Sequence, residues 1–181
     1  TLAITNSGTS TITGIISNGD SAAILTKAGA GTLTLSGDNT YTGATTVNAG
    51  VLSITHADSL GATDGATTVA NNAALNISGG ITTAAEGITI SGTGVSNRGA
   101  IRNISGDNTI AGQITIAAHT EIASDSGTLT LNISSGSSIT ASNKNVTFDG
   151  AGNITVADPI ATGSGTLTKS GSGTLTLSAA N

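Results

Sequence analysis

Short segments in which an aliphatic residue alternates with a small polar one recur along the whole chain. They read TLTL at 32–35, VLSIT at 51–55, GITIS at 87–91, QITIA at 113–117 and NITV at 153–156. Alternation with a period of two places one class of side chain on each face of a β-strand. Clusters of Gly, Asn, Asp and Ser separate the segments, and no stretch has the period of a helix. The pattern therefore predicts an all-β protein made of many short strands.

Parts of the sequence are repeated. Residues 25–36, LTKAGAGTLTLS, return at 167–178 as LTKSGSGTLTLS, and the pentapeptide SGDNT occurs at 36–40 and 105–109. Corresponding strands return after about 19 to 26 residues, which is the spacing of a solenoid whose coils each contain several short strands. We therefore expect a single parallel β-solenoid segment over residues 1–181, with about eight coils, that is a fragment of a longer array.

Stacking of coils explains why the aliphatic residues alternate with threonine. In TLTL, Leu33 and Leu35 point to one face of the strand and the threonines to the other. One coil cannot bury its aliphatic face alone, but coils stacked about 4.8 Å apart align these side chains into continuous ladders. We expect the leucines of the recurring tetrads, including Leu175 and Leu177, to stack inside the tube.

The composition excludes several classes of function. The chain has a formal net charge of −5 and only five Lys and Arg residues, so it has no basic face to neutralise nucleic acid or anionic lipid. No apolar run approaches the roughly 20 residues that span a bilayer, so we expect no membrane insertion by this segment. Cysteine is absent, which excludes disulfides and thiolate metal sites. We predict no cofactor.

Residues 26–52, TKAGAGTLTLSGDNTYTGATTVNAGVL, resemble the passenger-associated transport repeat, also called the autotransporter-associated β-strand repeat. Residues 168–181, TKSGSGTLTLSAAN, match the first half of that motif as a truncated second copy. The positions that carry the resemblance include Gly31, Thr32, Leu33, Thr34, Leu35, Gly37, Asn39, Tyr41, Gly43, Val47, Gly50 and Leu52. The resemblance implies a right-handed parallel β-helix in the exported part of a bacterial surface or secreted protein. In this family the repeat is associated with transport and with folding outside the outer membrane.

The resemblance implies a structural stalk segment rather than an enzyme, located outside the cell or at its surface, with the flanking repeats of the same chain as its partners. An alternative is an adhesive or self-associating module whose outward Thr, Ser and Asn side chains bind a host or matrix glycan, or a second copy. A carbohydrate-active enzyme is less favoured, because it needs carboxyl groups together in a cleft. The acids of this chain stand singly in turn-like contexts such as GDN, ADS and TDG.

The sequence predicts no metal site. His56 and His119 are isolated, without a second histidine at ligand spacing. The oxygen-rich SGDNT segment fits a turn better than a calcium loop, because Ala179 and Ala180 stand in the corresponding places of the C-terminal copy.

Two further patterns favour structural roles. Tyr41 corresponds to Ile110 in the second SGDNT copy, which favours an apolar corner residue over a catalytic phenol. Repeated Thr-x-Thr units can order water on flat β-helices, but the TLT copies at 32, 128 and 174 lie far apart. We therefore expect no regular threonine lattice.

Overall fold

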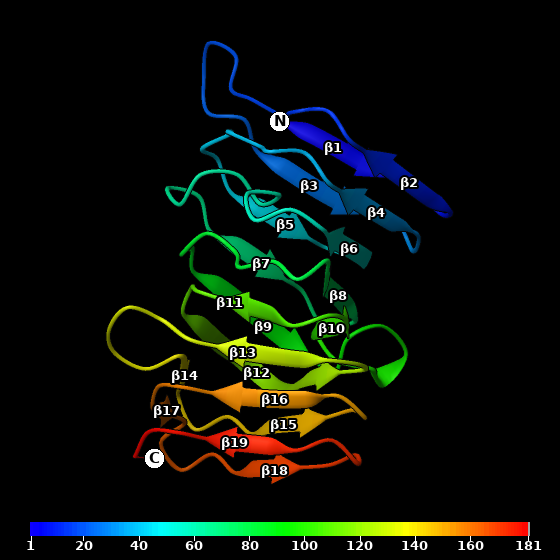
Figure 1. Ribbon diagram of the computed structural model, residues 1–181. Coiled ribbons are helices and arrows are strands. Elements are labelled where there is room, and N and C mark those ends of the chain that lie inside the picture. The colour runs from blue at the N-terminus through cyan, green and yellow to red at the C-terminus, as the bar shows by residue number, and fades with distance from the viewer. Residues whose placement is uncertain (181) are drawn as a thin grey trace.

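The computed structural model describes residues 1–180 as a stack of about eight coils, running from the N-terminus at one end to the C-terminal coil at the other (Figure 1). All strand pairings among these residues are parallel, as in the ladders that join β1 to β3 and β16 to β19. The only helical segment in the described part is a single 3-10 turn, η1 (Val95–Asn97). The predicted all-β solenoid is confirmed.

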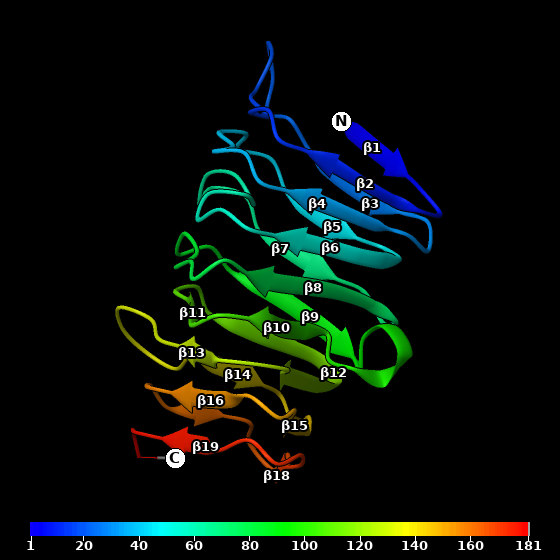
Figure 2. The same cartoon turned by 45° about the vertical axis from the view of Figure 1, so that its right-hand side comes forward.

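Two sides of the solenoid run through all coils (Figure 2). Side 1 consists of β1 (Leu2–Thr5), β3 (Leu25–Ala28), β5 (Thr45–Val47), β7 (Thr67–Val69), β9 (Ile88–Gly92), the first part of β12 (Ile114–Ser124), β14 (Ile139–Ala141) and β17 (Ile160–Ala161). Side 2 consists of β2 (Thr9–Ile12), β4 (Thr32–Leu35), β6 (Gly50–Ile54), β8 (Ala73–Ser78), β10 (Ile101–Ser105), the second part of β12, β15 (Val146–Asp149) and β18 (Leu167–Lys169).

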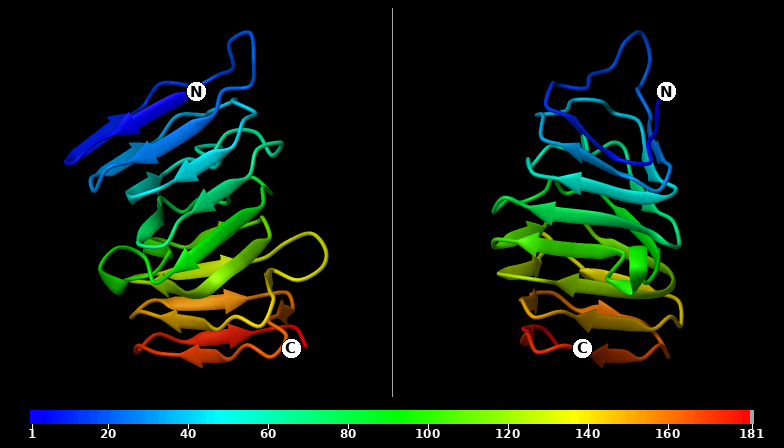
Figure 3. Two further views of the ribbon diagram at one scale, coloured as in Figure 1. Left: turned by 180° about the vertical axis from the view of Figure 1, so that it is seen from behind. Right: turned by 90° about the vertical axis from the view of Figure 1, so that its right-hand side faces the viewer.

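A third side is built from strands only in the C-terminal half. Side 3 consists of β11 (Asn108–Ile110), β13 (Thr128–Leu131), β16 (Asn153–Val156) and β19 (Leu175–Leu177). In the N-terminal coils its place is taken by the turns 13–24, 36–44, 55–66 and 79–87. A single bridge between Thr82 and Thr109 marks the transition. The cross-section therefore changes along the stack (Figure 3).

The core consists of inward ladders of aliphatic side chains. On side 2, Leu33 pairs with Leu52, and the ladder continues through Leu75, Ile101 and Ile122 to Phe148. Each of these side chains is fully buried. Burial of one such side chain contributes roughly 1.5–3 kcal/mol, so stacking neighbouring coils is the main source of stability.

The leucines of the repeated tetrads stack with residues of neighbouring coils, as expected, but the copies do not share one ladder. Residues 25–36 run from β3 to β4, around the corner between sides 1 and 2, whereas the equivalent residues 167–178 run from β18 to β19, between sides 2 and 3. Leu129 and Leu175 therefore stack with Ile154 on side 3, away from Leu33. The motif specifies a strand, a corner and a strand, and this unit fits more than one corner of the solenoid.

Three connections extend beyond the stack: the loop before β3, the loop between β9 and β10 that contains η1, and the loop between β13 and β14 (Figures 1 and 3). Among residues 1–180, no helix has the length and hydrophobicity needed to cross a bilayer. Asn181, the last residue of the second motif copy, lies outside the described residues.

Candidate functional site

The glycines of the repeat motif lie where one coil approaches the coil before it. A Cβ atom on Gly31 would lie 2.0 Å from the carbonyl oxygen of Gly8, and one on Gly50 would lie 2.4 Å from that of Gly31. Gly50 also has a positive φ of 68°. Gly37 and Gly43 are equally restricted, since their Cβ positions lie 2.5 and 2.3 Å from carbonyl oxygens of the preceding coil. No larger residue fits these corners without moving the backbone.

Lys27 occupies an inward position of β3 and is fully buried. Its Nζ donates hydrogen bonds to the carbonyl oxygens of Ala28 (2.9 Å), Gly29 (2.8 Å) and, in the next coil, Ala49 (3.1 Å). Burial lowers the pKa of this ammonium group below its usual value. Lys27 therefore links two coils without a carboxylate partner.

Lys169 repeats this arrangement in the second motif copy, with Nζ bonded to the carbonyl oxygens of Ser170 and, at 3.1 Å, Gly171. The sequence analysis did not identify either lysine as a contact residue. In both copies the lysine follows a threonine and stands two residues before a glycine, Gly29 or Gly171. This shared spacing is the signal that could have identified the lysines.

Asn39 connects three successive coils at the corner after β4. Its Oδ1 accepts a hydrogen bond from the backbone N–H of Ile16 (2.8 Å), and its Nδ2 donates to the carbonyl oxygen of Ser59 (2.7 Å). In the second SGDNT copy, Asn108 Oδ1 accepts from the N–H of Ile81 at 2.8 Å. The two SGDNT segments thus share the contact to the preceding coil, whereas Asn108 Nδ2 donates within its own coil, to Asn103 Oδ1 (2.6 Å) and the carbonyl oxygen of Ser105 (2.8 Å).

Tyr41 is fully buried, as is Ile110, the residue that corresponds to it. The Tyr41 hydroxyl lies 2.6 Å from Oγ1 of Thr45. Burial, with a smaller contribution from the charge of Glu86, raises the pKa of Tyr41 to about 12. Such a phenol is positioned for packing and for one interior hydrogen bond.

A polar column crosses the aliphatic core next to Tyr41. Thr45 stacks on Thr67 in the ladder of side 1, and the Thr67 hydroxyl donates a 2.5 Å hydrogen bond to Oε1 of Glu86. Glu86 is 2% exposed, and burial raises its pKa to about 7. Glu86 is the one carboxyl group among the buried residues of the described chain.

The other predicted motif residues take the following places. Val47 and Leu52 are fully buried in the ladders of sides 1 and 2. Thr32 and Thr34 alternate with the buried leucines of β4 and are partly exposed. Leu175 and Leu177 pair with Ile154 and Val156 in the last coil, where Leu177 is 40% exposed.

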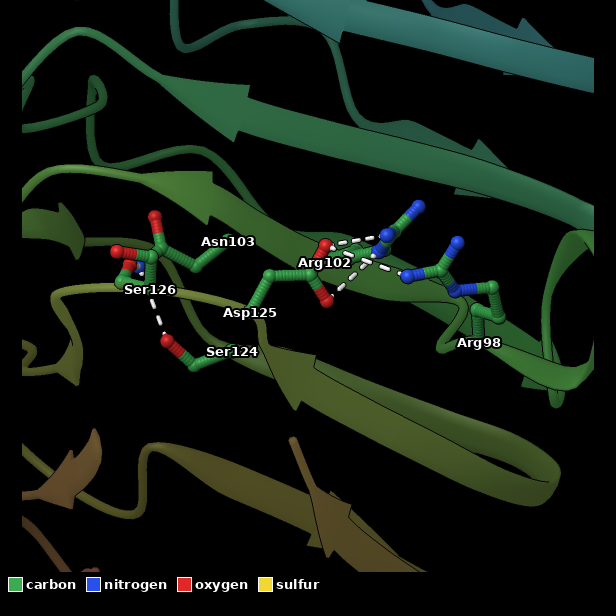
Figure 4. A network of polar contacts seen from close by, with 6 residues as sticks. All are labelled: Arg98, Arg102, Asn103, Ser124, Asp125 and Ser126. Carbon is green, nitrogen blue, oxygen red and sulfur yellow. Dashed lines mark hydrogen bonds and ion pairs between the residues drawn. The ribbon is translucent and has the colours of Figure 1, made fainter. Parts of the chain in front are cut away.

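One group of charged residues lies outside side 2. Arg102 of β10 binds both carboxylate oxygens of Asp125 in the next coil, and Arg98 lies 3.7 Å from the same carboxylate (Figure 4). Beside this network, buried Asn103 donates hydrogen bonds to Ser124 Oγ (3.1 Å) and to the carbonyl oxygen of Ser126 (2.9 Å). Asn103 and Ser124 continue the ladder of Ile77, so polar groups replace aliphatic ones where the corner to side 3 forms.

A hollow of about 330 Å³ lies next to this network, and its lining includes Arg98, Glu121, Asp125 and Asp149. Burial, and then the charge of Asp149, raises the pKa of Glu121, whose Oε1 is buried without a hydrogen-bond partner. The chain has one Tyr, one Phe and no Trp, and both aromatic rings are buried in the core. The hollow therefore offers ionic contacts but no ring on which a sugar could stack.

Outward threonines form a continuous ladder along side 1. Successive strands pair Thr26, Thr46, Thr68, Thr89, Thr115 and Thr140. The residues two positions before and after each threonine are Ile, Ala, Gly, Gln, Ser or Asn, all of them uncharged, and Lys144 lines the hollow beside Thr115 and Thr140. The ladder arises from segments other than the TLT copies, and the spacing of those copies therefore did not predict it.

The structure also brings together Asp38, His56 and Asp58, which the sequence presented as unrelated turn residues. One ligand atom of each lies within 4.8 Å of the others. By contrast, His119 accepts a hydrogen bond from the backbone N–H of Asn145 at 2.9 Å and belongs to no such group among the described residues.

Comparison with known proteins agrees with this geometry. The family model of the passenger-associated-transport-repeat matches residues 25–54, which contain β3 to β6, and residues 167–181, which contain β18 and β19. The chain is 44% identical over 61 residues to the adhesin BmaC autotransporter of Brucella suis biovar 1 (strain 1330). That match covers 34% of this chain and 2% of the relative. No solved structure matches the chain significantly. The matched parts of the chain are therefore similar to passenger-associated transport repeats and to a part of an autotransporter adhesin, and the stacked coils agree with that similarity.

Proposed function

We propose that the chain is a structural rod segment of the exported part of an autotransporter-type protein, located at the cell surface or secreted. The observation that carries the proposal is the inward ladder of side 2, which passes from Leu33 to Phe148 without a break. Each coil buries its apolar side chains against its neighbours, so folding propagates from coil to coil.

The corners support the same role. Lys27 and Asn39 bind backbone groups of adjacent coils, and Gly31 permits their close approach. These contacts join successive coils and hold the backbone of the corners in place. Without cysteine, no disulfide can form before the chain passes through a pore. We propose that the repeat aids export because each newly emerged coil is stabilised on the previous one.

The test uses the chain placed between a secretion leader and an outer-membrane translocation barrel in a Gram-negative host. Leu33→Asp places a charge in the core, whereas Thr34→Asp places it on the outer face of the same strand. We expect surface display, measured by antibody binding to intact cells, to fall for Leu33→Asp and to persist for Thr34→Asp. Equal display of Leu33→Asp and the parent chain would contradict a role of coil stacking in export.

A second candidate function is lateral association through the threonine ladder of side 1. The observation that favours it is the uncharged threonine ladder, with Lys144 beside its C-terminal part, in a chain whose net charge is −5, because two such faces can meet with little repulsion. The named relative is an adhesin, which agrees with a surface that makes contacts.

Sedimentation velocity over a range of concentrations tests the second candidate. The double substitution Thr68→Lys and Thr115→Lys should abolish association, whereas Thr34→Lys and Ser53→Lys on side 2 should leave it unchanged. A parent chain that stays monomeric at high concentration would argue against this role and would leave the rod proposal intact.

A further inference from the structure

The corner that follows side 2 carries a cluster of metal-ligating side chains that the structural role does not use. Asp38 comes from the turn after β4, and His56 and Asp58 come from the turn after β6. Because β4 and β6 pair in register, with Leu35 opposite Ile54, the two turns lie one above the other. Their ligand atoms fall within 4.8 Å of one another.

The backbone beneath the cluster is held in place by hydrogen bonds between the coils. The N–H of Asn39 donates to the carbonyl oxygen of Asp58 (3.2 Å), and Asn39 Nδ2 donates to that of Ser59 (2.7 Å). The Ser59 hydroxyl in turn donates to the carbonyl oxygen of Leu35 (2.9 Å). The side chains therefore project from a turn that is already ordered, which lowers the cost of bringing them onto an ion.

The imidazole of His56 faces Asp58 through its Nδ1 atom. Its Nδ1 accepts the backbone N–H of Asp58 at 3.2 Å and lies 3.8 Å from Oδ2 of the Asp58 carboxylate. Zinc binds N and O ligands at about 2.0–2.2 Å, so a tetrahedral ion places its ligands about 3.3 Å apart. The side chains of His56 and Asp58 are 41% and 46% exposed, so they can move together from 3.8 Å to the ligand spacing of about 3.3 Å. The same exposure leaves room for water on the ion.

We propose that Asp38, His56 and Asp58 form a zinc site that joins two successive coils. Two carboxylates balance the charge of a divalent cation, and imidazole selects a transition ion over Ca²⁺, which requires six to eight oxygen ligands. Water completes the tetrahedron. This site departs from the sequence expectation of no metal, because its ligands become neighbours only through the stacking of coils.

Titration of the intact chain with ZnCl₂ in a calorimeter tests the proposal. We expect about one zinc ion per chain, together with a rise in unfolding temperature, because the ion binds the folded corner and not the unfolded chain. His56→Ala and Asp38→Asn should each weaken binding at least about tenfold, since loss of even an outer-shell partner has an effect of that size. CaCl₂ should give no comparable signal.

His119→Ala is the matched control, because it removes the other histidine of the chain and leaves the cluster intact. Circular dichroism of each variant verifies that the fold is preserved, as expected for substitutions in an exposed turn. Zinc affinity unchanged in His56→Ala, or lost equally in His119→Ala, would overturn the proposal. Equally strong binding of Ca²⁺ would show an unspecific acidic surface instead. None of these outcomes bears on the rod function, which depends on the core ladders.

Discussion

At the scale of single residues, the corners impose the strictest requirements. The Cβ position of Gly31 coincides with a carbonyl group of the preceding coil, whereas nothing lies within 4 Å of the Cβ position of Gly87. Both glycines lie next to strands, and neither has a positive φ. The requirement for glycine at position 31 therefore comes from the approach of a neighbouring coil and not from its own backbone conformation.

Gly31→Ala should consequently destabilise the protein by about 1–3 kcal/mol, the usual cost of forcing extra volume into a packed site. Gly87→Ala should change the stability by less than about 1 kcal/mol. The added methyl group meets open space, and the lower conformational entropy of the unfolded chain slightly favours the folded state. Urea unfolding followed by circular dichroism measures both variants. A Gly31→Ala protein as stable as Gly87→Ala would mean that the corner can open without cost.

The buried carboxyl group of Glu86 makes stability depend on pH. Its pKa in the fold, about 7, is higher than its ordinary value of 4.5, mainly because of burial. The folded state therefore holds the proton more tightly, and this contribution to stability is fully present below pH 4.5 and is lost as the pH rises through 7. The loss amounts to about 3 kcal/mol over that range.

Glu86→Gln should remove this dependence, because the amide can still accept the hydrogen bond from Thr67 and does not ionise. The free energy of unfolding, measured in urea at pH 5 and pH 8, should fall between these values by more in the parent than in the variant. Comparing the two proteins cancels the contributions of other acids, including Glu121. Parallel pH profiles would show that Glu86 has no raised pKa.

At the scale of strands and corners, alternation along β4 separates two kinds of position. Leu33 and Leu35 are fully buried, whereas the intervening Thr34 is partly exposed. A strand of this type tolerates change on one face only, since every inward side chain contacts the coils before and after it.

Leu33→Asp should therefore unfold the neighbouring coils, with a loss of several kcal/mol or more, because an unpaired charge cannot be buried among aliphatic side chains. Thr34→Asp should change the stability by less than about 1 kcal/mol. The melting temperatures of the two purified variants measure this difference. An unchanged melting temperature for Leu33→Asp would place Leu33 outside the core.

At the scale of the whole molecule, the solenoid is a stack in which each coil contacts only its neighbours, so its stability is the sum of local terms. Charge is unevenly distributed along it: Arg98 and Arg102, two of the five basic residues, lie in the patch outside side 2. Lys27 is buried in the core, and the Arg98 side chain is 60% exposed in the loop between β9 and β10.

Native trypsin should therefore cut first after Arg98, and the coils on both sides of the loop should stay folded, because their strands are held by ladders of backbone hydrogen bonds. Mass spectrometry of the digestion products identifies the cleaved bond, and Arg98→Gln should make the folded chain still more resistant. Rapid cleavage after Lys27 under native conditions would be incompatible with a continuous solenoid.

The sequence by itself determined the strands and the solenoid, because alternation and repeat spacing are local consequences of backbone geometry and of the need to bury one face of each strand. It also indicated that Tyr41 and Ile110 occupy equivalent positions, and both are buried. The repeat motif was recognisable because its glycine, leucine and asparagine positions are set by one strand–corner–strand unit.

Only the tertiary structure decided which residues from different coils become neighbours. Turns of unequal length place the two motif copies on different sides, align Thr26 with Thr140 across the intervening strands, and bring Asp38 next to His56. The contact of Lys27 with the carbonyl oxygen of Ala49 was hidden for the same reason, since Ala49 belongs to the next coil. Contacts between coils depend on the summed lengths of strands and turns, and no local pattern in the sequence encodes that sum.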